Sequence, residues 1–305
     1  MLKQLALTTA LIASLGTAHA YQAEINANYE NTSFDGDSED LDTFGIGGKY
    51  YLNGVNTKNG PLAEAAFLSK ASNIGLGYTN SSIDEDGADL EIDSVGLNGE
   101  FFIPNSQFYV SGSLNRSEVT VEGEFGKVSD DNVGYALEAG YLPVDGLLIA
   151  AGVAKENLDP MYVSKNGFID TFSNISAVAD DTAVTLRAKY VTQIGNYFTN
   201  FEGATYFGDE TAYRLGADLY IDPTLSVGVS FMDTTFDDFD TVWAVRAQKF
   251  FTPTIAVGLN YTTTEDADVF TIRAKKFFTQ QVSVEGAIDF ADDGNVFGLR
   301  GAYRF

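Results

Sequence analysis

The sequence predicts an all-β protein, a transmembrane antiparallel β-barrel. Three observations support this: the final strand, the periodicity of the whole chain and the way its connections alternate. The final strand, residues 297–305, is apolar on one face and carries Arg300 and Arg304 on the other. A strand of this kind suits a sheet that has lipid outside and water inside.

Alternation with a period of two residues begins at Tyr21 and recurs to the end of the chain. Over residues 21–29 every odd position is Tyr, Ala or Ile and every even position is Gln, Glu or Asn, which is the pattern of a half-buried strand. Counting such runs predicts about sixteen strands, within a range of fourteen to eighteen. The predicted strands span residues 21–31, 42–52, 62–80, 89–103, 107–121, 132–142, 147–156, 181–192, 196–208, 211–221, 224–233, 240–251, 254–263, 267–278, 281–290 and 295–305.

The weakest of these runs covers residues 61–78, where the apolar register shifts between Phe67 and Ile74. We expect a bulge or a short additional element at this point. Elsewhere the pattern continues without a linker, so one barrel accounts for residues 21–305.

Two kinds of connection take turns between the predicted strands. One kind is short and contains Pro, Gly or Asn, as at residues 222–224, whereas the other is acidic and mostly longer, as at residues 81–89. Short turns on one side and longer loops on the other are typical of outer-membrane barrels, whose turns face the periplasm. The longest loop is predicted at residues 157–181, and the third loop, residues 123–132, is predicted to be short.

The N-terminus has the features of a secretory signal peptide. Lys3 provides a cationic start, residues 5–15 are mostly apolar, and Ala18, His19 and Ala20 form a small-x-small cleavage site. We therefore expect residues 1–20 to be removed on export to the outer membrane of a Gram-negative bacterium. No other segment approaches the ~18 apolar residues that a transmembrane helix needs.

The composition argues against several classes of function. A formal net charge of −25 disfavours a nucleic-acid partner. The chain has no cysteine, and its single histidine, His19, lies in the predicted signal peptide; this excludes imidazole catalysis and histidine-ligated metals from the mature chain. We expect no enzyme activity and no cofactor. Residues 35–40 and 84–89 are acidic but lack the calcium-loop pattern, so we interpret them as solvated loops.

Inward-facing charges are the candidate functional residues. Every second strand of the C-terminal half places one arginine between apolar positions, which turns it into the lumen when its neighbours face lipid. These arginines are Arg187, Arg214, Arg246, Arg273 and Arg300. The further inward charges are Lys189, Lys275, Glu100, Glu138, Glu202 and Glu285.

This pattern predicts a cationic wall on one side of the lumen and a neutral-to-acidic wall on the other. Such charged walls determine the selectivity of channels, and arginine keeps its charge at any working pH. Two alternatives remain open. The arginines could pair with neighbouring carboxylates and fill a narrow barrel, or they could form a specific anion site.

Aromatic residues gather near the turn-side ends of the predicted strands. We interpret them as a girdle at the membrane interface. They are Tyr50, Tyr51, Tyr141, Tyr190, Tyr220, Phe250, Phe251, Phe277 and Phe278.

The chain resembles the general porins of Gram-negative gammaproteobacteria. The resemblance rests on the signal peptide, the acidic loops, the arginines of the barrel wall and residues 60–68. It also rests on Tyr303-x-Phe305, which resembles the C-terminal signal by which outer-membrane barrels are recognised for insertion. The resemblance implies a sixteen-stranded, usually homotrimeric channel. Such a channel contacts outer-membrane lipid and lipopolysaccharide and lets ions and small hydrophilic solutes diffuse passively.

The resemblance leaves the pore constriction open, because general porins narrow their pore with a long third loop and this third loop is short. The main alternative function is a non-conducting structural or adhesive barrel with acidic surface loops. A soluble secreted β-protein conflicts with the outward positions predicted for Trp243, Phe270 and Phe297.

Overall fold

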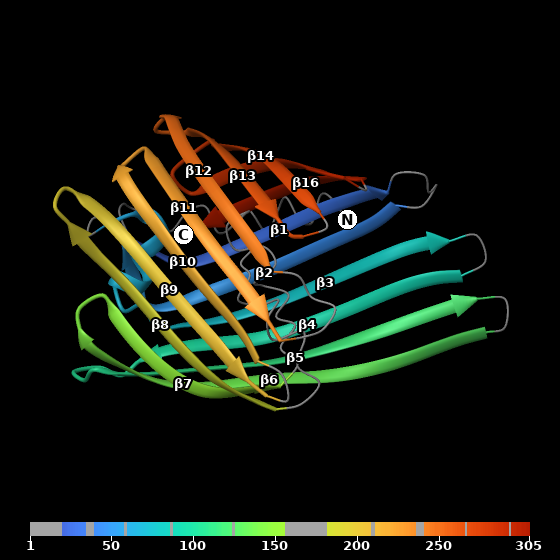
Figure 1. Cartoon of the computed structure of the whole chain (residues 1–305), viewed down its shortest axis with the longest axis horizontal. Coiled ribbons are helices and arrows are strands. Elements are labelled where there is room, and N and C mark those ends of the chain that lie inside the picture. Colours follow the sequence, from blue (N-terminus) through green and yellow to red (C-terminus); the bar gives the residue numbers. More distant parts are fainter. Residues whose placement is uncertain are drawn as a thin grey trace.

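The structure, a computed structural model, describes residues 20–34, 40–57, 60–85, 88–123, 126–155, 182–208, 211–235, 241–265, 267–292 and 294–305. Within these residues, sixteen strands form one closed antiparallel barrel, in which sequence neighbours pair and β1 pairs with β16 (Figure 1). The predicted all-β barrel and its number of strands are confirmed. The signal peptide and the loop at residues 157–181 were also predicted from the sequence; apart from Ala20, both lie outside the described residues.

The strands and helices have these bounds: β1 (Ala20–Phe34), β2 (Asp40–Asn56), η1 (Leu62–Glu64), α2 (Ala65–Leu68), β3 (Asn73–Glu85), β4 (Ala88–Phe102), β5 (Phe108–Gly123), β6 (Gly126–Val144), β7 (Leu147–Lys155), β8 (Ala183–Ile194), β9 (Tyr197–Phe207), β10 (Thr211–Asp222), β11 (Leu225–Thr234), β12 (Val242–Thr252), β13 (Ile255–Thr263), β14 (Asp268–Phe277), β15 (Val282–Ala291) and β16 (Gly294–Arg304).

The strand predicted at residues 62–80 is wrong in its first half. The 3₁₀-helix η1 and the single α-helical turn α2 occupy residues 62–68, and β3 begins only at Asn73. The sequence after Pro61 is rich in Ala, Leu and Glu, which favour helices. The shift of apolar register between Phe67 and Ile74 marks the change from helix to strand.

The outer surface of the barrel is apolar along its middle. Ile46, Leu76, Leu97, Leu186 and Val245 belong to five different strands, and each has about half of its side chain exposed. Their neighbours in sequence point into the barrel, as expected of strands that alternate between lipid and an aqueous interior. Among the described residues there is no helix with the length and apolar character needed to cross a membrane.

The predicted aromatic girdle is only partly correct. Tyr50, Tyr141, Phe251 and Phe278 are exposed. The lumen instead receives Tyr51, Tyr220, Phe250 and Phe277, which line its cavity. Tyr50 and Tyr51 occupy consecutive positions of β2, and Phe250 and Phe251 occupy consecutive positions of β12. Successive side chains of a strand point to opposite faces. One member of each pair must therefore point inward.

Two predicted loops are largely strand. β3 and β4 remain paired up to Glu85 and Ala88, and β5 and β6 remain paired up to Gly123 and Gly126. Figure 1 shows these hairpins projecting at the loop side of the barrel. The prediction depended on apolar alternation, whereas backbone pairing continues above the membrane, where outward positions become acidic. Gly126, the first described residue after the connection between β5 and β6, has a φ of 122°, which favours glycine.

The last strand closes the barrel against the first. A main-chain oxygen of Phe305 accepts hydrogen bonds from the backbone N–H groups of Gln22, at 2.6 Å, and Ala23, at 2.8 Å. Arg304 donates to Glu24 and lies over the ring of Tyr21. The C-terminal residue is therefore part of the β1–β16 seam.

Candidate pore and its constriction

The interior of the barrel contains a cavity of about 810 Å³ that is lined by both charged and aromatic side chains. Strands from both halves of the barrel line it, and so do η1 and α2, which connect β2 to β3 on the turn side. Residues 60–72, which we call the lumen segment, therefore fold into the barrel instead of lying across its opening. Such an inward element narrows the passage through the barrel.

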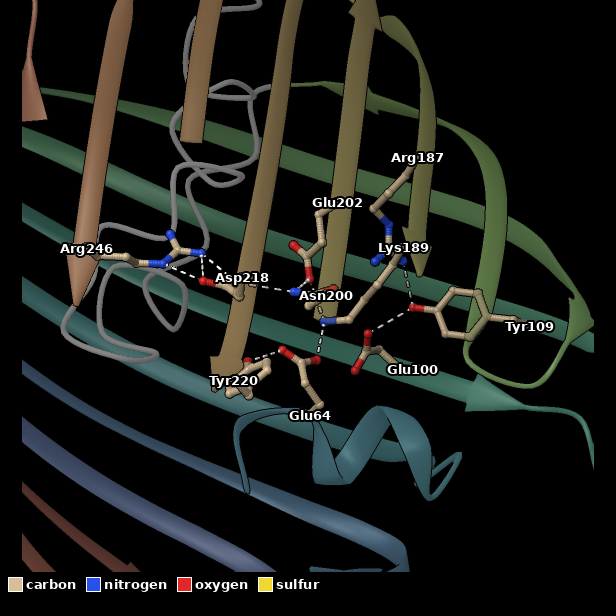
Figure 2. Close-up of polar contacts among 10 residues, drawn as sticks. All are labelled: Glu64, Glu100, Tyr109, Arg187, Lys189, Asn200, Glu202, Asp218, Tyr220 and Arg246. Atoms are coloured by element: carbon tan, nitrogen blue, oxygen red, sulfur yellow. Dashed lines mark hydrogen bonds and ion pairs between the residues drawn. The ribbon is translucent and has the colours of Figure 1, made fainter. Parts of the chain in front are cut away.

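Glu64 of η1 joins the lumen segment to the opposite wall. Its side chain is 5% exposed. One carboxylate oxygen lies 2.9 Å from Nζ of Lys189 on β8, and the other accepts a hydrogen bond from the hydroxyl of Tyr220 on β10, at 2.9 Å. Figure 2 shows these contacts above the helical turn. One buried carboxylate thus links η1 to two strands that are distant in sequence.

The other end of the lumen segment is fixed to its own side of the barrel. Ala65 and Ala71 are almost fully buried against Tyr51 and Val55 of β2. The ring of Phe67 lies 6.3 Å from that of Phe102, and Nζ of Lys189 lies 5.2 Å above the Phe67 ring. Small residues on the wall side let the helical turn approach β2 closely, while the larger Phe67 fills space towards the lumen.

A continuous network of charges leads from Glu64 along the wall. Nζ of Lys189 also lies 2.5 Å from Glu202, whose carboxylate accepts a hydrogen bond from the amide of Asn200 at 3.1 Å. Asn200 contacts Asp218 at 3.5 Å, and Arg246 donates to Asp218 through two nitrogens at 2.6–2.8 Å. Figure 2 shows the network passing from β8 to β12.

A second network surrounds Tyr109, whose side chain is 1% exposed. Its hydroxyl donates to Glu100 at 2.9 Å and accepts a hydrogen bond from Arg187 at 3.2 Å. Arg187 also donates to both oxygens of Glu138, at 2.5 and 3.1 Å. A third group lies near the β1–β16 seam, where Glu285 is 3.3 Å from Lys275 and 3.8 Å from Arg273.

Most of the charged residues predicted to face inward border the cavity. Arg273 and Arg300 do not, although they share the strand face of the cavity-lining Lys275 and Arg304. The residues at the cavity are Arg187, Arg214, Arg246, Lys189, Lys275, Glu100, Glu138, Glu202 and Glu285.

The expectation of a cationic wall opposite a neutral-to-acidic wall needs correction. Asp218, Glu202 and Glu285 come from the same half of the barrel as the arginines and form ion pairs with Arg246, Lys189 and Lys275. Positive and negative groups therefore alternate within one wall. The alternative of structural pairing describes Arg187, Arg246 and Arg273, each of which has a carboxylate partner.

Sequence reasoning missed Glu64, Asp218 and Tyr109. Asp218 occupies the same strand face as Arg214, so its inward position could have been deduced from alternation. Glu64 carried no such signal because it lies in a helical turn too short to show a period. Within the described part of the chain, no group of three or more His, Cys, Asp or Glu side chains could hold a metal ion.

Replacing one partner of a buried ion pair is expected to destabilise the barrel more than replacing both partners by apolar residues. Arg246→Met leaves Asp218, whose side chain is 15% exposed, without its guanidinium partner, and should lower the free energy of unfolding by about 3 kcal/mol. The double variant Arg246→Met/Asp218→Leu should regain most of this loss. Unfolding in urea, followed by gel mobility, measures both. Equal stability of the single and double variants would contradict the expectation.

Comparisons with known proteins agree with this architecture. A family model described as "Putative general bacterial porin" matches residues 1–281. The outer membrane protein Omp33 of Acinetobacter baumannii is 26% identical over 95% of this chain and 100% of that chain, with a TM-score of 0.57. OprB of Pseudomonas putida at low pH is 11% identical over 98% of this chain and 95% of that one, with a TM-score of 0.53. No curated protein matches the sequence.

The family model covers most of the sequence, and the Omp33 similarity covers nearly all of it. A closed barrel with a polar interior points to a channel rather than to an enzyme. The resemblance predicted from the sequence is therefore confirmed, and it supports placement in the outer membrane. The chain belongs to the family of putative general bacterial porins.

Proposed function

We propose that this porin is a passive channel whose water-filled passage is narrowed from the periplasmic side by the lumen segment. The observation that carries this proposal is the double contact of Glu64 with Lys189 and Tyr220 across the barrel interior. The passage between this segment and the charged walls admits ions and small hydrophilic solutes, and excludes solutes too large to pass beside the helical turn.

The charged residues that border the cavity line the passage beside the lumen segment. Because most ion pairs of the described residues join nearby strands of one wall, their fields largely cancel at a distance and discrimination between small ions is weak. The pore-lining role extends to Arg273 and Arg300, whose strand faces point inward. The acidic loops concentrate cations at the outer mouth and contact lipopolysaccharide through bridging divalent cations.

Conductance in a planar bilayer tests this function. We expect steady single-channel openings, a reversal potential of a few millivolts in a salt gradient, and swelling of liposomes in small sugars but not in large oligosaccharides. A folded barrel that carries no current and admits no sugar would overturn the porin proposal. It would favour the structural or adhesive alternative.

Export and assembly complete the proposal. Cleavage after Ala20 removes the signal peptide, Tyr303 and Phe305 serve as the insertion signal, and the mature barrel assembles as a homotrimer. The intact mass of the protein from outer membranes should be that of a chain beginning at Tyr21. Cross-linking in the membrane should give a trimer as its largest product. A protein that retains residues 1–20, or that cross-links to no trimer, would contradict these points separately.

A further inference from the structure

The loop-side ends of β2–β6 carry aliphatic side chains in a row that backbone pairing aligns across five strands. A second row lies beside it on β4 and β5. We call these seven residues the rim strip; they are Leu41, Ile83, Leu90, Val121 and Val128 in the first row and Ile92 and Val119 in the second.

The rim strip faces the channel axis. The ladders from β2 to β6 run without a register shift from the strip to the cavity, so alternate residues keep to one face. Val121 shares the odd positions of β5 with Ser113, and Leu90 shares the even positions of β4 with Asn98. Ser113 and Asn98 both line the cavity.

The opposite face of the same strand ends is acidic. Asp42 accepts a hydrogen bond from the hydroxyl of Tyr29 at 2.7 Å, and Asp93 accepts one from Tyr78 at 2.5 Å. Further towards the turn side, outward positions become apolar, as at Ile46. The strand ends thus invert the membrane-spanning pattern, which places the rim strip beyond the lipid and towards the water of the outer vestibule.

Part of the strip is exposed, and the strip has a charged neighbour on its own face. Val121 is 44% exposed and Val128 is 71% exposed. Asp130 lies two residues beyond Val128 and pairs across strands with Val119, and it is exposed as well. Contiguous apolar residues exposed beside charged ones mark a binding surface. Aliphatic groups beside one carboxylate complement a solute that has a short hydrocarbon body and a positive charge.

We propose that the rim strip binds small organic cations at the outer mouth of the pore, with their hydrocarbon part on the strip and their charge beside Asp130. Asp42 and Asp93 on the reverse face of the same strand ends add negative potential at the outer mouth. Binding concentrates these cations at the entrance of the channel and should favour their uptake. The effect on uptake rests on the proposed porin function, whereas the binding itself does not.

The absence of cysteine from the sequence permits a direct test. Val128→Cys places a single thiol on the strip, and Ser129→Cys places one on the reverse face as a matched control. The modification rate with a small neutral thiol reagent is measured in nanodiscs, with hexyltrimethylammonium or with tetramethylammonium. Hexyltrimethylammonium should slow modification of Val128→Cys about tenfold more than tetramethylammonium does, and should leave Ser129→Cys unchanged.

Two second-site changes in the Val128→Cys background test whether Val121 and Asp130 contribute to binding. Val121→Thr keeps the branched shape and Asp130→Asn removes the charge, and each should weaken protection about threefold. Equal protection of both thiols would show partition into the bilayer and overturn the proposal, as would unchanged protection in both second-site variants. Modification requires no ionic current, so a barrel that binds without conducting would overturn the porin function alone, and a conducting barrel without protection would overturn the rim strip alone.

Discussion

Replacing Lys189 by methionine is expected to raise single-channel conductance about two- to threefold and to make the current fluctuate, because a wider and less fixed passage conducts more. Lys189 lies between Glu64, at 2.9 Å, and Glu202, at 2.5 Å. Without the ammonium group, two partly buried carboxylates face each other without compensation, which is strongly unfavourable. Methionine keeps an unbranched apolar side chain beside Phe67 but loses the contact between the ammonium group and the ring. The repulsion should therefore release the lumen segment without altering the wall.

Lys70→Met is the matched control for this variant. Lys70 is in the lumen segment too, but its partner Asp145 has a side chain that is 97% exposed, and exposed ion pairs contribute little. Its conductance should stay at the value of the unchanged protein. Adding Glu64→Gln to Lys189→Met removes the repulsion and should restore part of the original conductance. Identical traces from Lys189→Met and the unchanged protein would show that the lumen segment does not control the passage.

The barrel itself could be predicted because its chemistry repeats at every strand. Residues 21–29 show why: a strand between lipid and water must alternate, and this requirement is visible without any knowledge of its partners. The inward direction of Arg187 and Arg246 follows from the same rule. Alternation describes a face, however, and not what a side chain touches on that face.

The pairing of charges could not be predicted for that reason. Arg246 on β12 pairs with Asp218 on β10, two strands away in the barrel. Lys189 pairs with Glu64, which lies in a segment far away in the sequence. Such contacts depend on register and on side-chain length, which period-two patterns do not contain. The helical part of the lumen segment could not be predicted either, because seven helical residues are too few to show a helical period. Only the break in the strand pattern near Phe67 indicated its position.

The pairing also changes how the arginines relate to function. An unpaired cationic wall would give anion selectivity, whereas alternating charges stiffen the wall and leave weak selectivity at mid-depth. The narrowest passage and the outer mouth then become the places where solutes are distinguished. The proposed function assigns sieving by size to the lumen segment and attraction of cations to the acidic loops, so variants of the two should alter different properties of the current.

Deleting Phe305 is expected to reduce the folded barrel in the outer membrane to a few per cent, whereas Phe305→Ala should retain folding in detergent. The backbone of Phe305 makes three hydrogen bonds with Gln22 and Ala23 that an alanine also makes. Deletion removes them and places the new terminal carboxylate on Arg304, beside its partner Glu24. The seam then loses hydrogen bonds and gains a repulsive pair.

The two variants separate closure of the barrel from recognition during insertion. In refolding from urea into detergent, where no insertion machinery is present, Phe305→Ala should reach the heat-modifiable folded form with nearly full yield, and the deletion should not. In cells, both should be depleted from the outer membrane if the terminal ring is the recognised group. Normal cellular levels of Phe305→Ala would restrict the role of this residue to its backbone, since the β1–β16 hydrogen bonds alone would then account for the effect of the deletion.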